Sequence, residues 1–84
     1  MAGSNRVRFA VCIDNSDYPA SLELHKIYRV VPDRQAEVEG DLRVVDESGE
    51  DYLYEADRFI AIDLPANAVR ALKRSFARHA SGTR

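Results

Sequence analysis

Asp46 to Ile62 reads DESGEDYLYEADRFIAI, and the other predicted elements are organised around this segment. Its first five residues are turn formers, and we expect Gly49 to take the left-handed conformation of a hairpin turn. Residues 51–54 then form a strand in which alternate side chains share a face. Residues 55–58 read as a single helical turn of the 3₁₀ kind, and residues 59–62 as another strand. The stretch predicts a hairpin turn, a strand, a one-turn corner and a final strand.

Residues 7–14 (VRFAVCID) alternate in polarity and predict the first strand. Phe9 is expected on the buried face, and Cys12 on the less buried face or in a second small core. No histidine or basic residue adjoins Cys12 to lower its pKa, so we do not expect a nucleophile. Residues 14–19 are dense in turn formers but lack the EF-hand pattern, which favours a loop held by its own side chain–backbone hydrogen bonds.

Two further strands and a helix complete the prediction. Residues 27–31 are rich in β-branched side chains and stop at a proline, and residues 42–45 form the third strand. The polar segment 33–40 between them is expected to be a loop. Residues 65–80 begin with proline, which suits the first position of a helix. An apolar stripe with helical spacing runs along this segment and consists of Val69, Leu72 and Phe76.

The 84 residues predict one domain. We expect a disordered leader over residues 1–5, a small barrel over 6–64, a basic helix over 65–80 and a disordered tail over 81–84. The sequence has no signal peptide and no run of the ~20 apolar residues that span a bilayer, so no membrane is expected. A single cysteine permits no internal disulfide and fits a cytoplasmic protein.

An enzyme is not expected. The sequence contains no nucleophile elbow, phosphate-binding loop, dinucleotide-binding glycine pattern or zinc-ligand spacing, and its acidic residues lie on turns and loops. A barrel of this size also offers little concave volume for a substrate. We therefore expect no catalytic residues, no cofactor and no metal.

Two segments carry a resemblance to SH3-like barrels, LELHKIYRVV at residues 22–31 and SGEDYLYEADRFIAI at residues 48–62. The first resembles the diverging turn and second strand of an SH3 domain, and the second resembles its fourth strand, 3₁₀ corner and fifth strand. Over about residues 7–65 the chain is similar to a group of small bacterial SH3-like proteins without an assigned activity. The resemblance implies a mostly β, five-stranded SH3-like barrel with a 3₁₀ corner before the last strand, and the sequence of residues 65–80 adds the C-terminal α-helix.

The chain departs from SH3 domains at the positions that bind proline-rich peptides. It has no tryptophan, and Glu55 and Arg58 stand near the corner positions where the family has proline and tyrosine. Polyproline recognition is therefore not expected. His25 stands where the diverging turn usually has glycine, so either the turn differs or His25 adopts a left-handed backbone at a cost of roughly 1 kcal/mol.

The first functional hypothesis is a non-enzymatic module that binds another protein through an exposed apolar patch and the corner. Its candidate residues are Tyr18, Tyr28, Leu53, Glu55 and Arg58. The alternative is that the tyrosines complete the core with their hydroxyl groups at the rim, which we favour for Tyr52 and Tyr54.

The second hypothesis is nucleic-acid binding by the C-terminal helix. Residues 66–84 hold five basic and no acidic residues, whereas residues 1–65 hold the other seven basic and all fourteen acidic residues. The candidate residues are Arg70, Lys73, Arg74 and Arg78. The alternative is a solvated helix face. We expect a monomer whose apolar stripe docks on its own barrel, with association of copies through the helix as the alternative.

Overall fold

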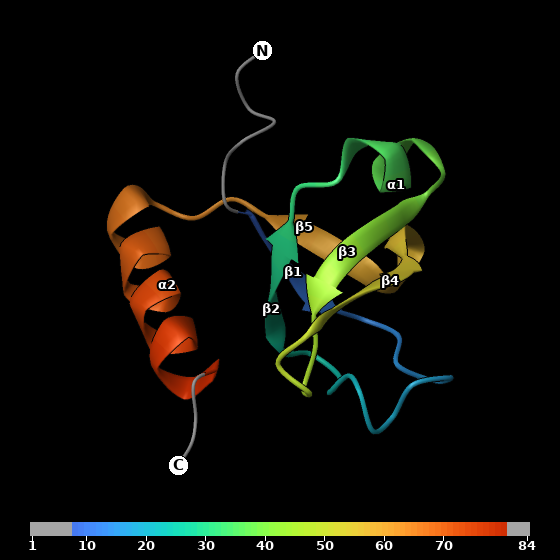
Figure 1. The fold of residues 1–84 in the computed structure, drawn as a ribbon, viewed down its shortest axis with the longest axis horizontal. Helices are drawn as coiled ribbons and strands as arrows, with labels where there is room; N and C mark the ends of the chain where they lie inside the picture. Colours follow the sequence, from blue (N-terminus) through green and yellow to red (C-terminus); the bar gives the residue numbers. More distant parts are fainter. Residues whose placement is uncertain (1–7, 81–84) are drawn as a thin grey trace.

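The computed structural model describes residues 8–80, and the side chains of residues 8–78. The strands are β1 (Arg8–Cys12), β2 (Ile27–Val31), β3 (Asp41–Val45), β4 (Asp51–Glu55) and β5 (Phe59–Ile62). The 3₁₀ turn η2 (Ala56–Arg58) joins β4 to β5, the short helix α1 (Arg34–Val38) precedes β3, and the helix α2 (Ala66–Ala80) follows β5. In Figure 1 the strands form one curved sheet and α2 stands beside it as a second layer.

The five strands pair in the order β4-β3-β2-β1-β5, and every pairing is antiparallel. The predicted strands, corner and C-terminal helix are thus confirmed. Within residues 8–80, β4 and β5 remain the two edges of the sheet, so its closure into a barrel is not confirmed. The edges still approach each other across the core, because the rings of Tyr54 and Phe59 lie 6.2 Å apart.

The core lies on the concave side of the sheet. Its buried members are Ala10, Cys12, Leu22, Tyr28, Val30, Val44, Tyr54 and Phe59. Because side chains alternate along a strand, the neighbours of these residues point to the opposite side, which we call the outer face. The pairing brings Phe9, Arg29 and Ile62 together on that outer face.

The expected orientation of the first strand is wrong. Cys12 is fully buried in the main core, and Phe9, which is also buried, lies on the outer face. Both faces of β1 are covered, the inner one by the core and the outer one by α2. Polarity alternation therefore identified the two faces without identifying which of them points to the main core. Val7 lies outside the described residues.

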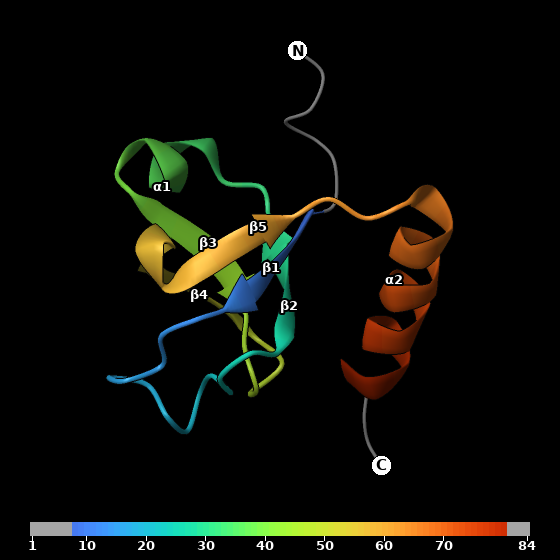
Figure 2. The same cartoon turned by 180° about the vertical axis from the view of Figure 1, so that it is seen from behind.

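Helix α2 docks on the outer face of its own sheet, as expected. The ring of Phe76 stacks on that of Phe9 with centroids 5.9 Å apart. Val69 and Leu72, the other members of the stripe, are half-buried, and no described side chain of α2 is fully buried. Figure 2 shows the helix beside the sheet at the end of a short link from β5. Within residues 8–80 neither helix is long and apolar enough to cross a membrane.

The expectation of a loop over residues 33–40 is wrong, because α1 occupies most of it. The side chain of Asp33 caps the helix by accepting a hydrogen bond from the backbone N–H of Ala36 at 3.1 Å. Capping satisfies one of the donors that a helix N-terminus leaves free, and Ala36 is buried beneath the turn. The three residues after Asp33 also favour helix, so the signal was present in the sequence.

The turns follow the sequence prediction. Gly49 has φ 86° and His25 has φ 67°, so His25 does adopt the left-handed backbone. Its N–H donates to the carbonyl oxygen of Cys12 at 2.7 Å, which ties the turn before β2 to β1. The loop after β1 is held by its own side chains: Asp14 accepts from the N–H of Ser16 at 3.0 Å, and Asn15 donates to the carbonyl of Leu22 at 2.9 Å.

Candidate functional site

A groove of about 740 Å³ separates α2 from the outer face of the sheet. One wall comes from β2 and β3, and the other from one side of α2. The hairpin turn between β3 and β4 borders one part of it. We call this space the α2 groove, and its apolar lining consists mainly of Val31, Val45, Phe76 and Ala77. Val31, Val45 and Phe76 are each half-buried, so apolar surface remains open along the groove.

The carboxylate of Glu47 is already bonded to other residues that line the groove. Its carboxylate pairs with the Lys26 ammonium at 2.7 Å and accepts a hydrogen bond from the hydroxyl of Tyr28. The same hydroxyl accepts from the N–H of Glu23 at 2.7 Å. Burial and the bond to Glu47 raise the pKa of Tyr28 well above its ordinary value. Tyr28 therefore stays protonated at neutral pH and acts as a structural link between β2 and the hairpin turn.

Asp46 is a buried carboxylate at the base of the same turn. It accepts hydrogen bonds from the Tyr54 hydroxyl at 2.6 Å and from the N–H and hydroxyl of Ser48 at 2.8 and 2.6 Å. Burial alone raises the pKa of Asp46, but the bonds from Ser48 and Tyr54 outweigh it and lower the pKa below 3.8. Burial and the bond to Asp46 raise the pKa of Tyr54 to about 12. The hydrogen bonds of Asp46 thus attach the start of the hairpin turn to the core.

Two cationic side chains in the groove form no ion pair with a described side chain. Arg29 projects from β2 and Lys73 from α2; both line the groove and both are exposed. Neither takes part in an ion pair with any residue whose side chain is described. By contrast, Asp51 on the same rim lies 3.4 Å from Arg43. The α2 groove is therefore apolar in its walls and positive in its unpaired charge.

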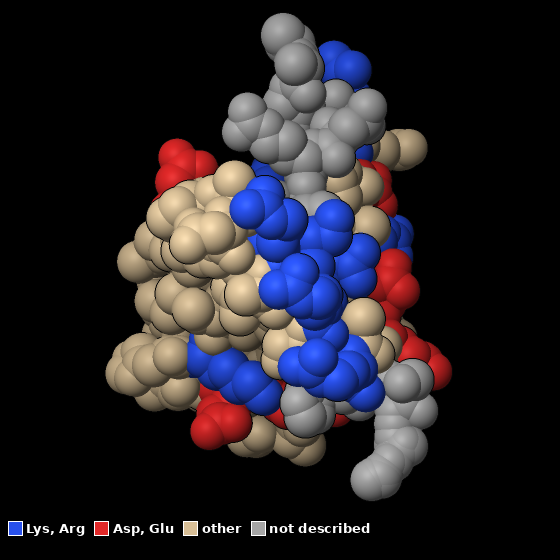
Figure 3. Space-filling model, turned by 90° about the vertical axis from the view of Figure 1, so that its left-hand side faces the viewer, with Lys and Arg blue, Asp and Glu red and all other residues tan. Residues whose placement is uncertain are grey.

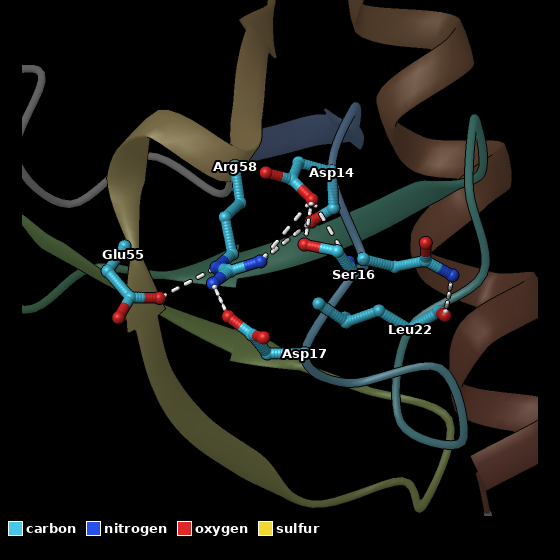
Figure 4. Close-up of polar contacts among 7 residues, drawn as sticks. Asp14, Ser16, Asp17, Leu22, Glu55 and Arg58 are labelled. Carbon is cyan, nitrogen blue, oxygen red and sulfur yellow. Dashed lines mark hydrogen bonds and ion pairs between the residues drawn. The ribbon is translucent and has the colours of Figure 1, made fainter.

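A second cluster gathers around Arg58 at the corner (Figure 4). The guanidinium pairs with Glu55 at 2.7 Å and with Asp14 at 3.4 Å, and it also pairs with Asp17. It lies over the ring of Tyr18, 4.9 Å from its centroid. The bonds to Glu55 and Asp17 raise the pKa of Arg58 above its ordinary value. With its side chain only 11% exposed, Arg58 clamps the long loop to the corner.

The structure divides the predicted protein-binding residues. Arg58 contacts both Tyr18 and Glu55 in the corner cluster, and Tyr18 also packs edge-on against Tyr54. Tyr28 is only 2% exposed, so the expectation that it joins an exposed apolar patch is wrong. Leu53 is 45% exposed on the edge strand β4. Of these candidates, only Tyr28 borders the groove, so the sequence prediction largely missed that site.

The tyrosines of β4 differ in burial. Tyr54 is buried with its hydroxyl bonded to Asp46, as the core interpretation requires. Tyr52 is 49% exposed and donates to Glu50 at 2.9 Å, so the core interpretation is wrong for this residue. The difference follows their neighbours, because Tyr54 packs against the rings of Tyr18 and Phe59, whereas Tyr52 has no ring contact with another described residue.

Replacing Arg58 with alanine is expected to lower the midpoint of thermal unfolding by about 5–10 °C. The change removes three charge-assisted contacts and exposes the face of Tyr18, although the partner carboxylates are half-exposed and solvent screens part of the loss. Thermal unfolding followed by circular dichroism measures the effect. Arg34→Ala is the matched control, because Arg34 is exposed on α1 and has no ion pair among the described side chains. Equal midpoints for the two variants would contradict the clamp.

Acid is expected to destabilise the fold below about pH 4.5. Hydrogen bonds from Ser16 lower the pKa of Asp14, and Arg58 lowers that of Glu55. Burial raises the pKa of Asp46, but its bonds to Ser48 and Tyr54 lower that pKa overall. Burial likewise raises the pKa of Glu47, but its bonds to Lys26 and Tyr28 lower it overall. A carboxyl group with a lowered folded-state pKa stabilises the fold above its ordinary pKa of 3.8 or 4.5. That stabilisation is lost as the pH falls through the folded-state value.

Thermal midpoints at pH 7, 5, 4 and 3 test this expectation. They should be nearly constant from pH 7 to 5 and then decrease. Asp46→Asn should show a shallower decrease, since its side chain does not titrate. A midpoint that rises from pH 5 to 3 would contradict the sign.

Among the described residues, no three histidine, cysteine, aspartate or glutamate side chains come together in a way that could hold a metal ion. Comparison of the chain with protein-family models, curated proteins and solved structures finds no match. The functional argument therefore rests on the α2 groove and on the charged surface of α2.

Proposed function

We propose that the chain is a non-enzymatic binding module of the SH3-like kind, and that it binds a segment of another protein in the α2 groove. The strand order and the 3₁₀ turn before the last strand support the SH3-like assignment. The main support for this binding site is that α2 covers only part of the apolar outer face of the sheet. Phe9 on that face stacks on the ring of Phe76, while Val31 and Val45 line an open space.

The volume of the groove suits a peptide. About 740 Å³ lies within the range of roughly 300–1,000 Å³ found for ligand sites, enough for a large apolar side chain and the backbone around it. Burial of apolar surface favours association by about 25 cal/mol per Å² before the cost of ordering the partner. The polar groups at the hairpin already satisfy one another, which leaves the apolar walls as the surface that gains most from a partner.

Filling the groove is expected to weaken binding at least tenfold. A random twelve-residue peptide library, displayed and selected against the protein, supplies the probe peptides. Ala77→Trp places an indole ring at the wall of the groove and should block them, with affinity measured by fluorescence anisotropy. Ala71→Trp is the matched control, because Ala71 is exposed on the same helix and does not line the groove. Selected peptides that bind both variants equally would refute the groove as the site.

A second candidate function, nucleic-acid binding, is supported by the outward side of α2. Arg70, Arg74 and Arg78 are exposed and follow one another at intervals of four residues, about 6 Å along the helix axis. Figure 3 shows the lysine and arginine side chains gathered in a band on the side of the molecule where α2 lies. Arginine suits phosphate because its planar guanidinium donates two parallel hydrogen bonds.

A labelled twelve-nucleotide single-stranded RNA tests this candidate. Three phosphate contacts predict that the logarithm of the binding constant falls by about 2 for each tenfold rise in salt. Arg70→Gln with Arg74→Gln should reduce both the affinity at low salt and that slope. Absence of binding at 20 mM salt would eliminate nucleic-acid binding through this face.

A further inference from the structure

The partner of the α2 groove can be described by its chemistry, because the charges in the groove are unequally satisfied. Three acidic residues border it. Asp46 is bonded to Tyr54 and Ser48, Glu47 to Lys26, and Asp51 pairs with Arg43. Each of these carboxylates therefore has a donor or a cation of its own.

The two cations that form no ion pair with a described side chain lie on different walls. Arg29 belongs to the sheet and Lys73 to the helix, and both border the same space as Phe76. Bringing apolar surface into the groove displaces water around the two charges. An uncompensated cation loses solvation in this process, so an apolar partner without an acidic group would bind with a penalty. A carboxylate beside the apolar side chain removes that penalty and gains a charge-assisted hydrogen bond.

We propose that the α2 groove binds a short acidic segment of another protein, in which a large apolar side chain is accompanied by one or two carboxylates. The apolar side chain lies between Phe76 and the outer face at Val31 and Val45, and the carboxylates contact Arg29 and Lys73. This inference rests on the proposed function of the groove. It adds the chemistry of the partner and assigns its recognition to two named cations.

The negative net charge of residues 1–65 is compatible with an acidic partner in the groove. Residues 1–65 carry fourteen acidic and seven basic residues, which would repel an acidic partner at long range. At physiological ionic strength, however, charges are screened over about 8 Å, so the nearest cations dominate within the groove. A nucleic acid would instead favour the continuous arginine row on the outward side of α2, which carries cations without apolar walls.

Selection of the same peptide library against three proteins tests the proposal. The wild type should enrich peptides that combine a large aliphatic or aromatic residue with Asp or Glu. Arg29→Glu with Lys73→Glu should bind those peptides at least tenfold more weakly, and its own selection should enrich Lys and Arg instead. Arg34→Glu with Gln35→Glu and Asn67→Glu has the same net charge, lies outside the groove and should behave like the wild type.

The outcomes separate this inference from the function on which it rests. Peptides that Ala77→Trp blocks, but that carry no excess of acidic residues, would overturn the acidic partner and leave the groove as a peptide site. Equal weakening by the two charge-reversed variants would also overturn it, because net charge rather than the groove cations would then decide. Peptides unaffected by Ala77→Trp would refute the groove itself.

Discussion

Phe9→Ala is expected to lower the free energy of unfolding by about 3–5 kcal/mol, the range for removing a fully buried phenylalanine. Phe9 is 1% exposed and is the residue of β1 on which α2 rests. Its loss removes the apolar centre of the second layer and the ring on which Phe76 stacks. We therefore expect the helix to lose its attachment to the sheet as well as the domain to lose stability. Urea unfolding followed by circular dichroism measures the first effect.

Phe76→Ala separates the two effects of Phe9→Ala. Phe76 is only half-buried, so its removal should cost about 1–2 kcal/mol while still releasing α2. Amide hydrogen exchange between Val69 and Phe76 should accelerate in both variants, whereas exchange in β1 and β2 should change only for Phe9→Ala. Unchanged exchange in α2 after either substitution would show that the ring stack does not hold the helix.

Asp46→Ala is expected to cost about 3 kcal/mol. The change removes the acceptor of the Tyr54 hydroxyl, which is buried in the core, and the acceptor of the two donors of Ser48. A buried donor left without an acceptor is costlier than the loss of an exposed hydrogen bond. The hairpin turn between β3 and β4 also loses the hydrogen bonds between its first residue, Asp46, and Ser48.

Asp46→Asn and Tyr54→Phe are the matched comparisons for Asp46→Ala. Asn keeps an acceptor of similar size, so its cost should be roughly half as large. Tyr54→Phe combined with Asp46→Ala should cost less than the sum of the single changes, because each removes the same hydrogen bond. Additive costs, or a cost below 1 kcal/mol for Asp46→Ala, would show that this bond contributes little.

The local signals in residues 46–62 were sufficient for the order of elements there. Gly49 allows the left-handed turn, alternation predicts β4, and the three residues after β4 form the corner. These features depend on neighbours close in sequence, which is why one chain suffices to predict them. The helix α1 is equally local, with its cap at Asp33, but the polar side chains of the same segment are also typical of a loop.

The groove could not be predicted in the same way. Its walls come from β2, β3 and α2, which are distant in sequence, and its width depends on where α2 rests on Phe9. The same limit applies to the faces of β1. Alternation placed Phe9 and Cys12 on opposite sides, but only the positions of the other elements decide which side is the main core. Pairing of charges is likewise a tertiary property, so Arg29 and Arg58 could not be distinguished from the sequence.

The depth of Cys12 gives the molecule a built-in reporter. Cys12 is fully buried in the core, where it pairs with Phe59 across β1 and β5, and it does not line the groove. A water-soluble thiol reagent can reach the sulfur only when the strands separate. The rate at which Cys12 is modified therefore measures how often the sheet opens. Release of α2 alone would leave that rate unchanged. One atom thus distinguishes motion of the outer layer from opening of the whole fold, without any introduced label.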